Sequence, residues 1–130
     1  HMIEETGEFV INLTTRELCR ATDYCGVATG AKTDKWKDCG LTKAPASAVS
    51  VPLIAESPVN IECRVIQKLE LGSHDMFIAR VEAVDVDEAL IDENGRLELD
   101  KAGLIAYDHG EYFELGNKLG KFGYSVRKKK

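Results

Sequence analysis

Several features that would place this chain in a familiar functional class are missing from its sequence. No apolar run approaches the roughly 18 residues that a membrane-spanning helix needs, and no segment resembles a signal peptide. There is no internal repeat and no low-complexity linker. At 130 residues the sequence therefore predicts a single domain without a membrane partner.

A strongly basic surface of the kind that binds nucleic acid is also missing. The chain carries 17 Lys and Arg against 22 Asp and Glu, a net charge of −5, which disfavours nonspecific contact with nucleic acid. The one basic run covers residues 127–130. We interpret it as a solvated tail, with a nucleic-acid or membrane contact as the alternative.

Neither a metal site nor a hydrolase motif is visible. The four cysteines form no C-x-x-C pair, and no histidine stands at zinc-finger spacing, so we expect no metal. The Gly-Lys-Ser/Thr ending of a P-loop and the G-x-S-x-G elbow are both absent. A domain of this size needs no disulfide staples, and we therefore predict buried or half-buried thiols in a reducing cytoplasm.

The first half of the chain predicts short elements. Residues 7–13 form a nearly continuous apolar run, typical of a buried strand. Thr14 and Glu17 match a capping box and predict a helix from that point. Thr33 predicts the cap of a second, short helix that ends at Gly40. Residues 41–48 are turn-like, and a short strand is expected at 49–54.

The second half contains the clearest β pattern. Apolar and polar residues alternate along 59–71, which predicts a strand with one buried and one solvent-facing side and a bulge near Ile66. The alternation resumes after the turn at 72–75 and continues to about residue 86, as in an antiparallel hairpin. A helical turn at 97–102 and short strands at 104–107 and 112–115 follow. These elements predict a mainly β, α+β domain with an antiparallel sheet or barrel of about six strands and one or two short helices.

A few residues are candidates for chemistry. His74 stands at the hairpin turn, where a ligand can reach it, or it is simply an exposed turn histidine. Lys35 follows a glycine-containing loop at a helix start, which suits an anion, although a solvated lysine is the plainer interpretation. Trp36, the single tryptophan, and Tyr107 could stack on a planar ligand or pack in the core.

Taken together, these segments resemble the flavin reductase-like family with the FMN-binding split-barrel fold, and its flavoredoxin branch in particular. Order and spacing agree over nearly the whole chain. The family pattern has about three further strands before residue 7, so the resemblance predicts a Greek-key split barrel that is incomplete at its N-terminus. We place this domain at residues 3–126, and His1-Met2 looks like an expression scar. The matching segments are residues 7–13, 24–30, 34–36, 40–42, 55–58, 61–63, 71–78 and 107–116.

The resemblance implies a homodimeric, cytoplasmic oxidoreductase. It would bind FMN and pass electrons from a nicotinamide cofactor, NAD(P)H, or from a redox protein partner. By position, Lys35 matches the lysine close to the flavin, His74 the histidine at the donor side, and Tyr107 an aromatic near the ring. The alternative is a non-catalytic, truncated module that dimerises or is completed by a partner chain. The residues matched to the cofactor site are Thr29, Gly30, Lys35, Trp36, His74 and Tyr107, with His74 as the catalytic residue.

Overall fold

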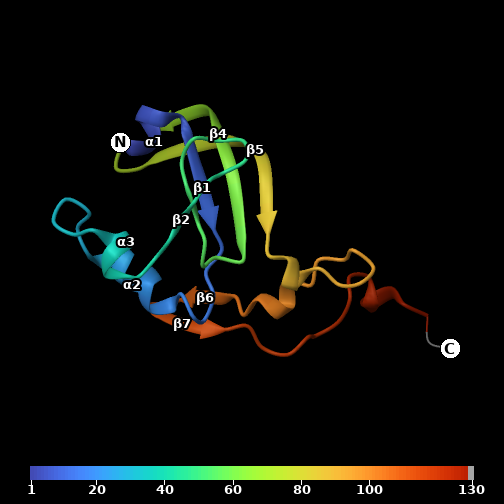
Figure 1. The fold of residues 1–130 in the computed structure, drawn as a ribbon. Coiled ribbons are helices and arrows are strands. Elements are labelled where there is room, and N and C mark those ends of the chain that lie inside the picture. Colours follow the sequence, from blue (N-terminus) through green and yellow to red (C-terminus); the bar gives the residue numbers. More distant parts are fainter. Residues whose placement is uncertain (129–130) are drawn as a thin grey trace.

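A long antiparallel hairpin organises the fold (Figure 1). The computed structural model describes residues 1–128, so Lys129 and Lys130 of the basic run lie outside the described residues. The hairpin consists of β4 (Val59–Glu70) and β5 (Asp75–Val86), and β1 (Glu8–Asn12) pairs with the other edge of β4. The order β1-β4-β5, antiparallel throughout, confirms the expected sheet type.

Two smaller antiparallel pairs and several short helices complete the described residues. Residues 1–128 thus contain seven strands, which agrees with a mainly β, α+β domain. The paired strands are β2 (Lys43–Ala44) with β3 (Leu53–Ile54) and β6 (Ile105–Asp108) with β7 (Glu111–Glu114). The helices are α1 (Met2–Thr6), α2 (Cys19–Val27), α3 (Lys35–Asp38), and the 3-10 turns Glu88–Leu90, Leu99–Ala102 and Tyr124–Val126.

The hairpin carries the predicted bulge and one that was not predicted. Val65 pairs with Ala79 and Gln67 with Ile78, so Ile66 is the extra residue on β4. On β5 the extra residue is Glu82. A bulge adds one residue to one strand and bends it, which shifts the alternation of the two faces along this hairpin.

The expected solvent-facing side of β4 is not solvent-facing at its start. Asn60 is 5% exposed and Glu62 is fully buried, so the prediction of a polar outer face is wrong there. The alternation of residue types does locate the strand, but both faces of this half of β4 are covered. Buried polar groups must then find hydrogen-bond partners within the protein, and the neighbouring loop supplies them.

Two predicted helix starts are displaced. The helix expected from Thr14 begins only at Cys19, because Thr15 is held in a bridge with Leu104 and its hydroxyl accepts a hydrogen bond from the Leu18 amide at 3.3 Å. The cap of α3 is Asp34, not Thr33, since the Asp34 carboxylate accepts from the Lys37 amide at 3.3 Å. Gly40 follows α3 with a φ of 66°, as expected for a helix end.

The strand predicted over residues 49–54 is also shorter than expected. Only Leu53–Ile54 pairs as β3, and its partner β2 lies in the segment predicted as a turn. The amides of residues 47–50 donate to the carboxylates of Glu62 and Glu8. These amides are therefore not available for a strand ladder.

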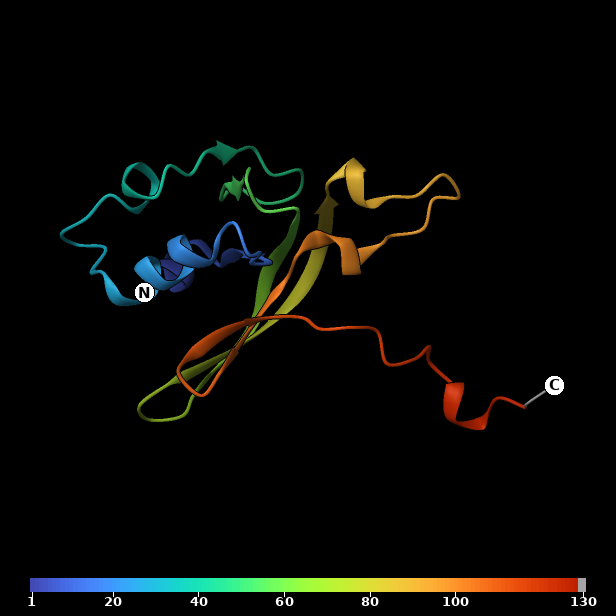
Figure 2. The ribbon, with the colours of Figure 1, turned by 90° about the horizontal axis from the view of Figure 1, so that it is seen from below.

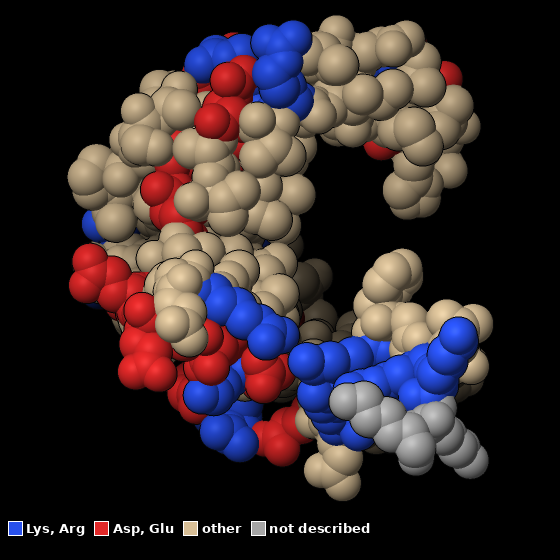
Figure 3. Space-filling model, turned by 90° about the vertical axis from the view of Figure 1, so that its right-hand side faces the viewer, with Lys and Arg blue, Asp and Glu red and all other residues tan. Residues whose placement is uncertain are grey.

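The molecule is open and exposes much more surface than a compact monomer. It exposes 10229 Å², whereas a compact protein of this mass is expected to expose about 6,800 Å². Residues that follow β7 run away from the body in both ribbon views (Figure 2), and the space-filling view shows a C-shaped outline (Figure 3). Within residues 1–128, no helix is long and apolar enough to cross a membrane.

Candidate functional site

Lys35 begins α3 and holds this short helix against the end of α2. Its ammonium group donates to the Cys25 carbonyl at 2.7 Å, and the side chain is only half-buried. A second hydrogen bond also joins α2 to α3: the Tyr24 hydroxyl donates to the Asp38 carboxylate at 2.7 Å. The two contacts fix the position of a lysine that the sequence singled out as an anion-binding residue.

The loop between α2 and α3 closes around Lys35. A Cβ placed on Gly30 would lie 3.9 Å from the Lys35 Cε atom, so the side chain passes directly by this glycine. The Thr29 carbonyl accepts hydrogen bonds from the Lys32 amide and the Thr33 hydroxyl, which curls the loop. Thr29 and Gly30 thus lie in the loop that closes on Lys35.

Trp36 adds an aromatic surface beside this loop. It is half-buried, and the Lys43 ammonium group lies 5.2 Å from its ring centroid. A cation over an indole face is a stabilising contact. Trp36 follows Lys35 in α3 and contacts Lys43, so this end of the molecule combines positive charge with an aromatic ring.

Tyr107 lies on β6, in the β6–β7 hairpin that contacts α2. Its ring packs edge-on against Tyr112, with ring centroids 5.4 Å apart. The Tyr112 hydroxyl donates to the Asp23 carboxylate of α2 at 3.0 Å, and Arg16 pairs with Glu114 at 2.8 Å. Tyr107 itself stays 67% exposed, which leaves it free to contact a ligand or another chain.

His74 is not brought to this cluster. It is exposed at the turn of the β4–β5 hairpin, and the contacts it makes among the described residues stay within that turn. Its ring nitrogen Nδ1 lies 2.9 Å from the Ser73 hydroxyl, and its carbonyl accepts from the Leu71 amide. His74 and Lys35, which the family resemblance places at one flavin site, therefore do not meet within one copy of the chain.

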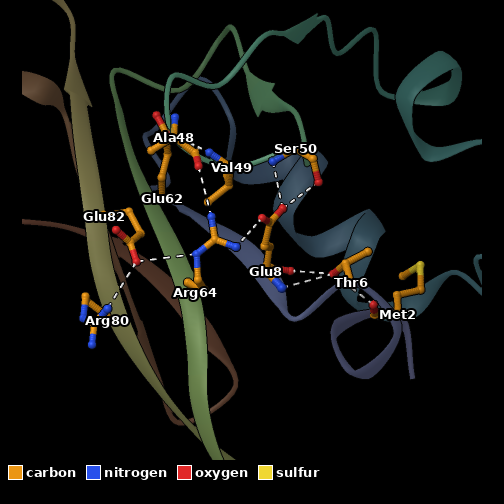
Figure 4. Close-up of polar contacts among 10 residues, drawn as sticks. All are labelled: Met2, Thr6, Glu8, Ala48, Val49, Ser50, Glu62, Arg64, Arg80 and Glu82. Carbon is orange, nitrogen blue, oxygen red and sulfur yellow. Dashed lines mark hydrogen bonds and ion pairs between the residues drawn. The ribbon is translucent and has the colours of Figure 1, made fainter.

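A polar cluster around Arg64 was missed by the sequence analysis (Figure 4). The Arg64 guanidinium lies 2.8 Å from Glu8 and 3.6 Å from Glu82, and donates to the Ala48 carbonyl at 3.3 Å. Glu8 also accepts from the Ser50 amide and hydroxyl, and these bonds lower its pKa. The cluster joins β1, β4 and β5 to the loop at residues 47–50.

The fully buried Glu62 and the half-buried Asp85 form a carboxylate pair next to this cluster. Glu62 accepts from the amides of Ser47, Ala48 and Val49. The hydrogen bond with Asp85, together with those amides, lowers the pKa of Glu62 although burial opposes it. The same hydrogen bond, burial and the charge of Glu62 raise the pKa of Asp85 to about 6. No sequence pattern distinguishes these acids from the solvated ones.

Comparison with known proteins identifies what this arrangement is similar to. The family model of the flavin reductase like domain matches residues 1–116. An uncharacterized protein of Archaeoglobus fulgidus is 36% identical over 91 residues, which are 70% of this chain and 51% of that protein. The chain thus spans about half the length of this curated relative.

Solved structures show the same architecture. The flavoredoxin of Desulfovibrio vulgaris (Miyazaki F) superimposes with a TM-score of 0.86 and 31% identity, over 96% of this chain and 68% of that one. A Shewanella frigidimarina protein with a split barrel domain gives a TM-score of 0.79 at 20% identity, over 94% of this chain and 63% of that one. The split-barrel fold expected from the sequence is therefore confirmed.

Proposed function

Since the chain belongs to the flavin reductase-like family, we propose that it forms part of an FMN-binding oxidoreductase. The observation that carries the proposal is the grouping of Thr29, Gly30, Lys35 and Trp36 at α3, braced by α2. Bound FMN would supply the capacity to accept a hydride or electrons from NAD(P)H or a protein donor. The Thermus thermophilus neighbour, at a TM-score of 0.72, is described as an FMN-binding protein.

The residues present fit one wall of such a site. FMN carries a phosphate and a planar ring, and the ring becomes anionic on reduction. Lys35 and Lys43 provide positive charge, and Trp36 provides an aromatic face that Lys43 contacts. The exposed ring of Tyr107 would cover part of the same ligand. A cation held at this place favours the anionic reduced form of the ring.

His74 would act at the donor side of the site as the catalytic residue. Because it makes no contact with Lys35 within one chain, we propose that a second copy of the chain brings the two together. An exposed histidine can donate a hydrogen bond or position the electron donor. The family resemblance and the exposed position of the β4–β5 turn support this arrangement.

A homodimer also suits the open shape of the molecule. Residues 116–130 carry six Lys and Arg and no acid, whereas residues 1–115 carry 22 acids and 11 bases. Leu119, Phe122 and Val126 on this C-terminal arm are almost fully exposed, and Figure 3 shows Lys and Arg gathered near the C-terminus. The basic arm of one copy is therefore complementary in charge to the acidic body of a second copy. We place this homodimer in the cytoplasm.

The test of the proposal is FMN titration of Lys35→Ala. Loss of one charge-assisted contact is expected to weaken FMN binding about tenfold. Lys37→Ala is the matched control, because Lys37 lies exposed on the same helix. Lys35→Arg keeps the charge and should retain most of the affinity. Equal FMN affinities of Lys35→Ala and the unaltered chain would contradict the assignment.

The second candidate function is a non-catalytic module of the same fold. The large exposed surface and the isolated His74 favour it. NADH oxidation in the presence of FMN distinguishes the two functions. Turnover that falls with His74→Ala, but not with Ser73→Ala, supports the oxidoreductase. Flavin binding without turnover supports the module.

A further inference from the structure

Cys25 and Cys39 lie beside each other where α2 meets α3. The contact between Tyr24 and Asp38 joins the residues next to these cysteines, and Lys35 bonds to both sides of the junction. Its ammonium group donates to the Cys25 carbonyl at 2.7 Å, while its own carbonyl accepts from the Cys39 amide at 3.1 Å. Two residues 14 positions apart are thereby held in one small volume.

The Cys25 side chain lies near enough to Cys39 to affect the ionisation of its thiol. The pKa of the Cys39 thiol is raised first by burial and then by the charge and hydrogen bonding of Cys25. Both residues are half-buried free thiols. Cys63, in contrast, is buried within β4, and burial raises its pKa.

Cavities give reagents access to both thiols. Cys25 lines a largely apolar cavity on one side of α2, and Cys39 lines the adjoining one. Leu18, Ala21 and Leu41 contribute to the walls of both cavities, so the two cysteines line adjoining spaces. A small sulfur compound that enters either cavity meets a protein thiol with a second thiol next to it.

We infer that Cys25 and Cys39 form a dithiol–disulfide couple that exchanges with small disulfides. One cysteine thiolate attacks a sulfur of the small disulfide, which forms a mixed disulfide and releases one small thiol. The other cysteine attacks the protein sulfur of that bond, closes the Cys25–Cys39 disulfide and releases the second small thiol. The two protons lost by the cysteines leave on the two released thiols, and a small thiol reverses the sequence.

The closed form would tie the end of α2 covalently to the end of α3. A disulfide needs Cα atoms about 4.4–6.8 Å apart, and the non-covalent braces already hold the two segments together. The inference goes beyond the proposed function and stands without it, because the exchange is between sulfur atoms only. It also goes beyond the sequence analysis, which predicts thiols at all four positions.

The test uses the full-length chain, without added flavin, in mixtures of oxidised and reduced dithiothreitol. Samples are quenched with N-ethylmaleimide, digested and analysed by mass spectrometry. The expected result is that Cys25 and Cys39 lose reactivity together, with a peptide pair linked through them, while Cys63 stays reactive after unfolding. Independent loss of the two thiols, or no linked pair at the most oxidising ratio, would overturn the inference.

The Cys39→Ser variant distinguishes a disulfide couple from two cysteines that react independently. With oxidised glutathione, Cys39→Ser should accumulate a stable glutathione adduct at Cys25, because no second thiol resolves it. The unaltered chain and the matched control Cys19→Ser should close the disulfide instead. An adduct on Cys25 that persists in the unaltered chain would show that Cys39 does not resolve it, and would contradict the couple.

Discussion

At the scale of single residues, the pH dependence of stability rests on two carboxyl groups, Glu62 and Asp85, that no pattern in the sequence distinguishes. Glu62 has 0% exposure and holds a loop through three backbone amides. Asp85 can hydrogen-bond to it only when one of the two carboxyls is protonated, and its buried Oδ2 atom has no other partner among the described residues. Two ionised carboxylates in contact repel each other. The pair therefore makes the free energy of unfolding depend on pH.

The sign of this dependence follows from the direction of each pKa. Asp85, whose pKa is raised from 3.8 to about 6, binds its proton more tightly when folded. Its contribution to stability therefore falls as the pH rises through that window. Glu62, whose pKa is lowered from 4.5, stabilises the fold above its unfolded pKa and loses that contribution in acid.

Asp85→Asn tests the pair. The substitution removes the second charge and keeps a donor for Glu62, so it should stabilise the protein at neutral pH by about 1 kcal/mol. In this variant, the fall in stability that Asp85 causes between pH 3.8 and about 6 should disappear. Urea unfolding at a series of pH values measures both effects. Asp108→Asn, at the exposed end of β6, is the control and should keep the dependence of the unaltered chain.

At the scale of elements, the sequence predicts where most strands and helices lie and fails at their starts. The β4–β5 hairpin is predicted with its bulge at Ile66 because residue alternation is a direct record of strand geometry. The start of α2 is missed because a bridge between Thr15 and Leu104, which lie far apart in the sequence, competes with helix formation. Lys35 could be found from its loop, whereas its brace to Cys25 depends on tertiary packing.

The cap of α3 gives a prediction at this scale. Asp34→Ala removes the acceptor of the Lys37 amide and should destabilise the protein by about 1 kcal/mol. Thr33→Ala should cost less, since the Thr33 hydroxyl donates to the Thr29 carbonyl on an exposed loop. Thermal unfolding of both variants compares them. If Thr33→Ala lowered the stability more than Asp34→Ala, Thr33 would be the cap, as the sequence predicts.

At the scale of the whole molecule, the chain exposes surface that a single folded copy does not normally expose. Its 10229 Å² exceed the roughly 6,800 Å² expected for a compact protein of this mass. The sequence predicts an incomplete barrel through family resemblance. Figure 3 shows a C-shaped outline from one side, and Figure 2 shows the residues after β7 running away from the body.

The charge separation between arm and body gives a prediction for assembly. If the basic arm of one copy contacts the acidic body of another, self-association should weaken as salt screens the charges. Sedimentation velocity over a series of salt concentrations measures this. Replacing Lys118 and Lys121 by Gln should lower the salt dependence, while Arg96→Gln, on an exposed turn of the body, should leave it unchanged. Assembly that strengthens with salt would indicate apolar contacts alone.

Gel filtration of the chain after incubation with excess FMN, followed by visible absorption, tests whether the chain holds flavin. We expect flavin absorbance to elute with the protein, at the volume of a species larger than one chain. We also expect Lys35→Ala to elute at the same volume with less flavin. Protein that elutes without flavin absorbance at every loading concentration would contradict the assignment of FMN to α3 and its loop.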